Sequence, residues 1–149
     1  MAGARAIVDR LGLLPHPEGG WYRETWREAA QGDGRVWATG ILFLLEAGQR
    51  SHWHRVDAAE MWIYNTGDPL RLRGAAGPDG ETALPDVTLG PDFAAGHAVQ
   101  HLYPAGQWQA AEPLGAWTLV TCIVAPGFEF PGFELAPPDW RPACLRETR

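Results

Sequence analysis

Residues 48–60 read Gly48-Gln49-Arg50-Ser51-His52-Trp53-His54-Arg55-Val56-Asp57-Ala58-Ala59-Glu60. Side chains alternate along a strand, so in an extended segment His52 and His54 are expected to point to the same face. A polar turn precedes Glu60, and a hairpin at that turn would fold its carboxylate back beside the two imidazoles. Such a group suits a divalent transition metal, and it equally suits metal-free acid/base chemistry. Asp57 competes with Glu60 as the carboxylate, although it falls in the middle of the turn.

The rest of the sequence predicts many short strands. Its 18 Gly and 13 Pro are spread along the chain as turns between apolar or alternating segments. Only the first dozen residues have a helical pattern, which Pro15 must end. Besides the segment with the two histidines, strands are expected at 21–27, 36–45, 59–64, 70–74, 82–89, 97–103, 107–111 and 117–124. About eight or more antiparallel strands favour a closed barrel or a jelly roll, which leaves no exposed edge.

Length and composition limit the classes of partner. A chain of 149 residues is expected to form one domain, residues 1–149. The net charge of −6, without a basic cluster, argues against a nucleic-acid partner and leaves small molecules or a second copy of the chain. Cys122 and Cys144 have neither metal-type spacing nor a disulfide framework. No apolar stretch approaches the ~20 residues of a membrane span, and no leader segment is recognisable, so a cytoplasmic protein without membrane contact is expected.

Several blocks of the sequence resemble the cupin superfamily, and in particular its cupin-5 branch, formerly a domain of unknown function. The spacing Gly48-x3-His52-x-His54-x5-Glu60-x6-Gly67 is similar to the first cupin motif. Residues 104–109 stand where the second motif has Pro-x-Gly-x-x-His, and the blocks 15–25, 53–70 and 125–130 are similar to the cupin-5 branch. The resemblance implies an all-β fold, the double-stranded β-helix or jelly-roll cupin barrel, here with a short N-terminal helix. It also implies a homodimer and a relation to nucleotide-sugar epimerases.

The sequence departs from the cupin pattern at two places. The spacing before Glu60 is longer than usual, and Gln109 occupies the position of the last histidine ligand. The resemblance implies that His52, His54, Glu60 and Gln109 would hold one divalent transition metal, namely Zn, Fe, Mn, Ni or Cu. An amide oxygen is a poorer ligand for such a metal than an imidazole. A bound metal and a metal-free site therefore both remain open.

Other residues are weaker candidates for the site. Tyr22 and Glu24 share one face of the first expected strand and would lie at the mouth of a pocket. His16 lies in a turn flanked by prolines and is expected to order that turn. Most tryptophans are expected to fill the core. The residues expected to contact a substrate are Glu24, Trp62, Tyr64 and His101.

Three functions follow from these residues. In a metal-free epimerase or isomerase acting on a sugar-like or carbonyl substrate, His54 would remove a proton next to a carbonyl. Glu60 would orient His54, and Tyr22 would return a proton from the other face. Alternatively, a metal held by the four implied ligands would serve a lyase, an isomerase or a dioxygenase. The third function is a non-catalytic barrel that binds a small molecule, and the acid, base and histidines at one place disfavour it. The first is the favoured prediction.

Overall fold

The computed structural model of the protein describes residues 3–146, which form one α-helix and twelve β-strands. The predicted all-β fold with an N-terminal helix is confirmed. The elements, in chain order, are α1 (Ala4–Leu11), β1 (Leu14–Pro15), β2 (Trp21–Glu28), β3 (Ala38–Glu46), β4 (Ser51–Val56), β5 (Ala59–Gly67), β6 (Leu70–Ala76), β7 (Thr82–Ala83), β8 (Val87–Leu89), β9 (Gln100–Tyr103), β10 (Trp108–Pro113), β11 (Trp117–Ala125) and β12 (Phe133–Leu135).

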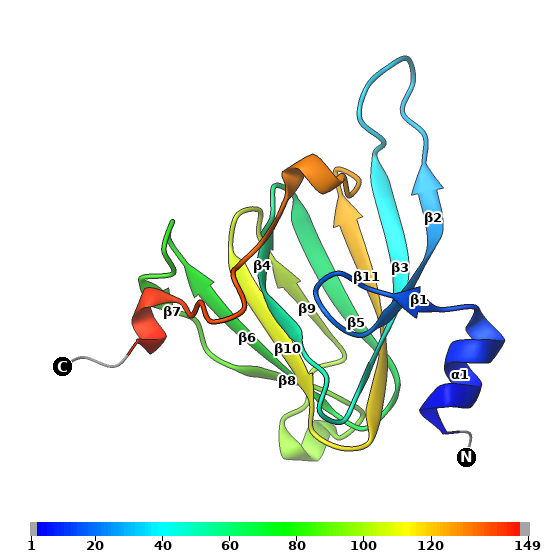
Figure 1. The fold of residues 1–149 in the computed structure, drawn as a ribbon, viewed down its shortest axis with the longest axis vertical. Coiled ribbons are helices and arrows are strands. Elements are labelled where there is room, and N and C mark those ends of the chain that lie inside the picture. The colour runs from blue at the N-terminus through cyan, green and yellow to red at the C-terminus, as the bar shows by residue number, and fades with distance from the viewer. Residues whose placement is uncertain (1–2, 147–149) are drawn as a thin grey trace.

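The strands form two antiparallel sheets that face each other (Figure 1). One sheet has the order β1-β2-β3-β11-β5-β9, and the other has the order β12-β4-β10-β6-β7, with β8 also paired to β6. Consecutive strands such as β4 and β5 lie in different sheets, so the chain crosses repeatedly between them. The interior therefore receives side chains from both sheets, which is the arrangement of a jelly roll.

Three local features differ from the sequence prediction. The helix ends at Leu11, before Pro15, because Gly12 adopts a left-handed conformation there with φ 65°. The strand expected over 82–89 is divided into β7 and β8, since residues 84–86 include Pro85, which cannot donate to a ladder. Strands β1 and β12 were not predicted, because they are two and three residues long.

The helix covers the outer face of the first sheet. Val8 of α1 and Leu13, just after the helix, pack with Leu44, Trp117 and Leu119 of the sheet. The helix thus lies over a face formed by β3 and β11. No helix within residues 3–146 is long and apolar enough to cross a membrane.

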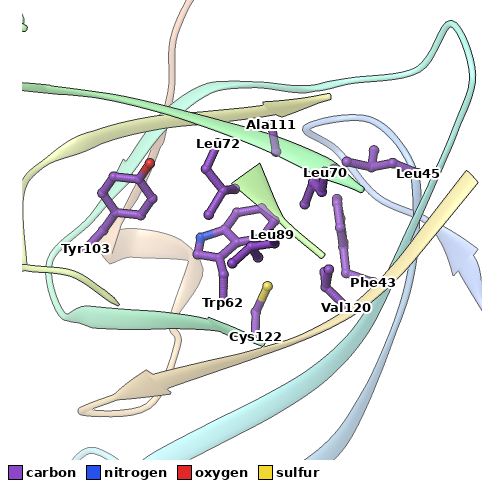
Figure 2. Packing of buried hydrophobic residues seen from close by; sticks show 10 residues of the cluster. All are labelled: Phe43, Leu45, Trp62, Leu70, Leu72, Leu89, Tyr103, Ala111, Val120 and Cys122. Carbon is purple, nitrogen blue, oxygen red and sulfur yellow. The ribbon is translucent and has the colours of Figure 1, made fainter. Parts of the chain in front are cut away.

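Along β3, β5 and β11 alternate side chains point into the barrel. At one end of these strands the inward side chains pack together as a core, and at the other end they line a cavity. Phe43, Trp62 and Val120 are at most 1% exposed and belong to the main core. Figure 2 shows the indole of Trp62 among the core side chains, which come from both sheets. Burying a side chain of this size contributes about 2 kcal/mol each. Further along the same strands the inward positions carry Thr39, Glu60 and Val124, which line a cavity.

Candidate functional site

The turn between β1 and β2 places Glu18 inside the barrel. Its two glycines adopt positive φ angles, 105° for Gly19 and 82° for Gly20. The backbone N–H of Glu18 donates to Nδ1 of His16 over 3.1 Å, which ties His16 into the turn as expected from the sequence. The carbonyl oxygen of Glu18 accepts from the backbone N–H of His52 over 3.0 Å. These bonds fix the turn against β4, so the Glu18 side chain is held over the inner face of that strand.

The tautomer of His54 follows from its hydrogen bonds. Its Nδ1 lies 2.7 Å from the carbonyl oxygen of His52, which can only accept, so Nδ1 carries a hydrogen. In the neutral ring Nε2 is then free to accept. Burial lowers the pKa of His54, which is 2% exposed, against the opposing effect of Glu60. His54 is therefore held as a neutral imidazole whose acceptor nitrogen faces the interior.

Glu18 meets that acceptor nitrogen. Its Oε2 lies 3.2 Å from Nε2 of His54, and its Oε1 accepts from the hydroxyl of Ser51 over 2.7 Å. Burial raises the pKa of Glu18 from 4.5 to about 8, although the Ser51 hydrogen bond lowers it. At neutral pH Glu18 is therefore protonated and can donate to His54. Glu18 and His54 together hold one transferable proton.

Glu60 supplies a second buried carboxyl group. It lies on β5 between Tyr103 of β9 and Val124 of β11, and it is 7% exposed. Burial is the main cause that raises its pKa to about 7, and the charge of Glu18 adds to it, while His54 and a hydrogen bond from Gln109 lower it. Its Oε1 is buried without a hydrogen-bond partner among the described residues. Glu60 is therefore close to half ionised at neutral pH, and one of its oxygens makes no hydrogen bond to the described residues.

These groups lie in a cavity of about 650 Å³. The side chains of Ile41, Val56, Cys122 and Val124 form much of its apolar wall. Burial keeps the pKa of the Cys122 thiol well above its usual value, so this residue stays uncharged. His16 also lines the cavity, and burial together with His54 lowers its pKa to about 4, so it is neutral. The site thus combines titratable groups with a largely apolar surrounding.

Three phenylalanines cover part of the cavity, and we call this group the roof. Phe128, Phe130 and Phe133 contact one another with ring centroids 5.1–6.4 Å apart. Arg35 fastens this segment by donating to the Gly127 carbonyl oxygen over 2.7 Å and to both carboxylate oxygens of Asp57 over 2.8 and 3.0 Å. We call these contacts the Arg35 clamp. Asp57, the alternative carboxylate of the sequence prediction, is thus used in the clamp and is absent from the cavity lining.

The mouth of the cavity carries residues of β2. Tyr22 and Glu24 both line it, as their shared strand face predicts. Tyr22 packs edge-on against the His16 ring, with centroids 4.5 Å apart. Glu24 is bound by Arg27 through two hydrogen bonds of 2.7 and 2.9 Å. The entrance therefore presents a tyrosine and an ion pair to an incoming molecule.

His52 lies outside the barrel, and the expectation that it points inward beside His54 is wrong. Between two paired positions, Gln109 with His54 and Ala111 with Ser51, β4 advances three residues while β10 advances two. This β-bulge changes the parity of the strand, so Ser51 and His54 both face inward although they are three residues apart. The imidazole Nε2 of His52 instead donates to the Pro137 carbonyl oxygen over 2.8 Å.

Three further residues expected to contact a substrate do not line the cavity. Trp62 is fully buried in the core, where its Nε1 donates to Oε1 of Gln109 over 2.5 Å. Tyr64 donates its hydroxyl hydrogen to the Gly67 carbonyl oxygen over 2.7 Å. His101 packs edge-on against Tyr103, with ring centroids 4.8 Å apart. Of the substrate-contact residues, the structure brings only Glu24 to the cavity with His54 and Glu60.

The ligand set that the cupin resemblance implies does not fit a metal here. His52 is on the opposite face of β4 from His54, and the Gln109 oxygen already accepts from Trp62. Nδ1 of His54 is committed to a backbone carbonyl, and its Nε2 faces the Glu18 carboxyl group. Within residues 3–146 no three His, Cys, Asp or Glu side chains converge in a way that could hold an ion.

The sequence prediction did not include Glu18 among the site residues. The sequence predicts a turn at His16, but nothing in local periodicity shows that a turn before the first long strand folds into a barrel. One local feature could have indicated a role in the site: an acidic residue stands between a histidine and two glycines, in a segment otherwise suited to a tight turn.

Comparison with known proteins gives one family and several solved structures. Residues 5–136 match the family described as "Cupin superfamily (DUF985)". A protein from Shewanella oneidensis is 38% identical, with a TM-score of 0.84 over 91% of this chain and 85% of its own. A hypothetical protein from Leishmania major is 32% identical, with a TM-score of 0.81 over 91% of this chain and 88% of its own.

A more distant structure shares the fold alone. Oxalate decarboxylase from Bacillus subtilis is 17% identical, with a TM-score of 0.58 over 81% of this chain and 29% of the enzyme. No curated protein matches the sequence.

Proposed function

Because the chain belongs to the cupin superfamily, in the family described as DUF985, we propose that it is a small-molecule enzyme that moves protons within its barrel. The proposed reaction is an isomerisation or epimerisation of a sugar-like or other carbonyl compound. The observation that carries the proposal is the pair of buried carboxyl groups, Glu18 and Glu60, whose pKa values are raised to about 8 and about 7 in one cavity with His54. Groups that exchange protons near neutral pH are what general acid/base catalysis requires.

The two carboxyl groups have different roles in this proposal. Glu60 is the general base, because its Oε1 has no protein partner among the described residues and is free to approach a substrate. It takes the proton from the carbon next to the substrate carbonyl. The Glu18–His54 pair is the general acid and donates its proton to the developing oxyanion. To form the isomer, Glu60 returns its proton to the former carbonyl carbon while the Glu18–His54 pair takes back a proton from the hydroxyl on the adjacent carbon. To form the epimer, Tyr22 donates a proton to the opposite face of the original carbon, the pair takes back the proton from the enol oxygen, and Glu60 and Tyr22 then re-equilibrate with solvent.

The surroundings of the pair support such a cycle. The hydrogen bond from Nδ1 of His54 to the His52 carbonyl oxygen keeps Nε2 directed at Glu18, so a proton lost to the substrate can be recovered at the same atoms. The apolar wall limits access of water, which strengthens the electrostatic interactions inside the cavity. Tyr22 at the mouth is available to contact the substrate oxygen atoms. In this proposal Glu60 is the base, whereas the sequence predicts His54 as the base with Glu60 orienting it.

The proposal is tested by proton exchange with solvent. The protein is incubated in D₂O with a panel of nucleotide sugars and small carbonyl compounds, and loss of the carbon-bound proton signal is followed by ¹H NMR. Glu60→Gln is expected to lower the exchange rate roughly 100-fold or more, the usual contribution of a general base. Glu81→Gln removes an exposed carboxylate near β7 and is the matched control, expected to exchange like wild type.

Two results would contradict the proposed chemistry. If folded Glu60→Gln kept the wild-type exchange rate, Glu60 could not be the base. If no compound of the panel exchanged with wild type, the reaction class itself would be refuted for these substrates.

A further inference from the structure

A second cavity lies on the outer face of the other sheet and has no part in the proposed reaction. It has a volume of about 110 Å³. It extends across β4, β10 and β6, which are adjacent in that order. The side chains that give it its character are Arg50, His52, Arg71, Arg73, Ala110 and Glu112.

Parity and side-chain size explain why the surface is hollow there. Leu70 and Leu72 point into the core, so the alternating residues Arg71 and Arg73 point outward. Ala110 pairs with Arg73 across the strands and is too small to fill the space above the sheet. The β-bulge adds the His52 side chain to the same outer face.

The cavity contains more cationic groups than the protein itself neutralises. All 12 basic residues of the chain are arginines, and three of them line this hollow. Arg71 pairs with Glu112 through a terminal nitrogen, and Asp86 lies 3.7 Å from Nε of Arg73, beyond hydrogen-bond distance. Three guanidinium groups therefore face two carboxylates, although the whole chain has a net charge of −6.

Two donors in this hollow lack acceptors. The Nε atoms of Arg71 and Arg73 are buried and have no hydrogen-bond partner among the described residues. The side chains of Arg71 and Arg73 are 39% and 35% exposed, but these two N–H donors are shielded from water without gaining an acceptor, which carries a desolvation cost. The guanidinium of Arg73 is also restrained, since its central carbon lies 5.9 Å from the centroid of the Trp53 ring. The donors are thus held in place before any ligand arrives.

From these observations we propose that the outer hollow binds a small oxyanion, either a phosphate group or a carboxylate. Its oxygens accept from Nε of Arg71 and of Arg73, and Arg50 adds charge at the rim. Arginine is well suited to this role, because its planar donors match the oxygens of both groups. A volume of about 110 Å³ accommodates a single such group and is well below that of pockets for drug-sized ligands.

The site is tested by titrating the protein with inorganic phosphate and, separately, with acetate at constant ionic strength. The Nε–H signals of Arg71 and Arg73 in ¹H–¹⁵N NMR spectra are expected to shift and saturate with at least one anion. Saturation with phosphate identifies a phosphate site, and saturation with acetate alone identifies a carboxylate site. If neither anion moves these two signals to saturation, the proposal is refuted.

Variants give an independent answer by calorimetry. Arg71→Gln combined with Arg73→Gln is expected to weaken binding roughly ten-fold or more, since it removes two charge-assisted hydrogen bonds. Glu112→Gln removes a competing carboxylate and is expected to tighten binding, which a merely unfolded variant would not do. Arg10→Gln, on the exposed side of α1, is the matched control and is expected to bind like wild type. Equal binding by all of these variants and wild type would also overturn the proposal.

Discussion

Oε2 of Glu18 and Nε2 of His54 lie 3.2 Å apart inside the barrel, although 35 residues separate them in the chain. The pKa of the carboxyl is raised and that of the imidazole is lowered, so their usual order is reversed. The proton therefore resides on Glu18 at neutral pH, and the pair carries no net charge. A hydrogen bond between neutral partners avoids burying two separated charges, which would be expensive in this apolar cavity.

This arrangement predicts that stability falls as the pH rises from about 6.5 to 8. The pKa of Glu18 is about 8 in the folded protein against an ordinary value of 4.5, so over this range the folded state holds a proton that the unfolded state has lost. Stability decreases with pH wherever the folded state binds more protons. Glu18 alone then costs about 2 kcal/mol across this range. The measurement is the free energy of unfolding in urea at each pH.

Below pH 6.5 the histidines oppose this trend. The pKa of His16 is lowered from 6.5 to about 4, so the unfolded state binds the extra proton there and stability rises with pH. Between pH 4.5 and 6.5 the raised pKa values of Glu18 and Glu60 lower stability as the pH rises, while the lowered pKa values of His16 and His54 raise it. Little net change is therefore expected in that range, and the loss of stability follows above pH 6.5. Glu18→Gln stays uncharged at every pH and should remove much of the loss above pH 6.5. An unchanged loss in that variant would contradict the assignment of the shift to Glu18.

Replacing His54 and His52 one at a time tests whether the proposed chemistry depends on the cavity or on the outer face of β4. His54→Ala is expected to abolish most proton exchange, roughly 100-fold or more, because the acid pair is lost. His52→Ala keeps the backbone carbonyl that orients His54 and should retain nearly full exchange. Elemental analysis of untagged protein should show the same metal content in wild type and both variants. Equal loss of exchange and metal in the two variants would instead support shared coordination.

The turn that holds Glu18 depends on Gly20. A Cβ added there would lie 2.6 Å from Cδ2 of Leu45 and 2.8 Å from the Leu44 carbonyl oxygen, at a φ of 82°. Gly20→Ala is therefore expected to destabilise the protein by about 2 kcal/mol or more, measured by urea unfolding. Gly32→Ala is the matched control, because Gly32 has a φ of 81° with no atom within 4 Å of the added Cβ. If Gly32→Ala loses less stability than Gly20→Ala, the difference measures the steric crowding around the added Cβ. If both variants lose the same free energy of unfolding, backbone strain alone explains the effect and the crowding argument is wrong.

A homodimer remains a prediction. The apolar strand predicted over 36–45 needs cover on both faces, and α1 provides part of that cover for β3. Exposed apolar side chains nevertheless remain along and beyond β2, where Trp26 is 44% and Trp37 59% exposed. Light scattering at micromolar concentration is expected to give twice the chain mass of 16.3 kDa. A mass of one chain would contradict it.

The sequence was sufficient for the fold and for part of the site. Strands such as β3 and β11 are long and apolar, so their prediction depends on local pattern alone. His54 and Glu60 were found because the chain carries them in a recognisable motif. His52 was misplaced because one extra residue in β4 reverses parity, and no local pattern marks a bulge. Glu18 was missed because its role depends on contacts between a turn and a strand far along the chain.

The Arg35 clamp makes the opening of the cavity sensitive to ionic strength. Its carboxylate partner, Asp57, is half exposed, so dissolved ions compete with the contact. The segment that carries Phe128 and Phe130 is held near Arg35 by this ion pair and also by hydrogen bonds from the backbone N–H groups of Gly127 and Phe128. Its far end at β12 is held by backbone pairing with β4. Added salt is expected to weaken the ion pair and to leave the backbone hydrogen bonds intact. For the proposed reaction, admission of substrate and release of product are expected to depend on the composition of the medium, so turnover rates should be compared at matched salt concentration.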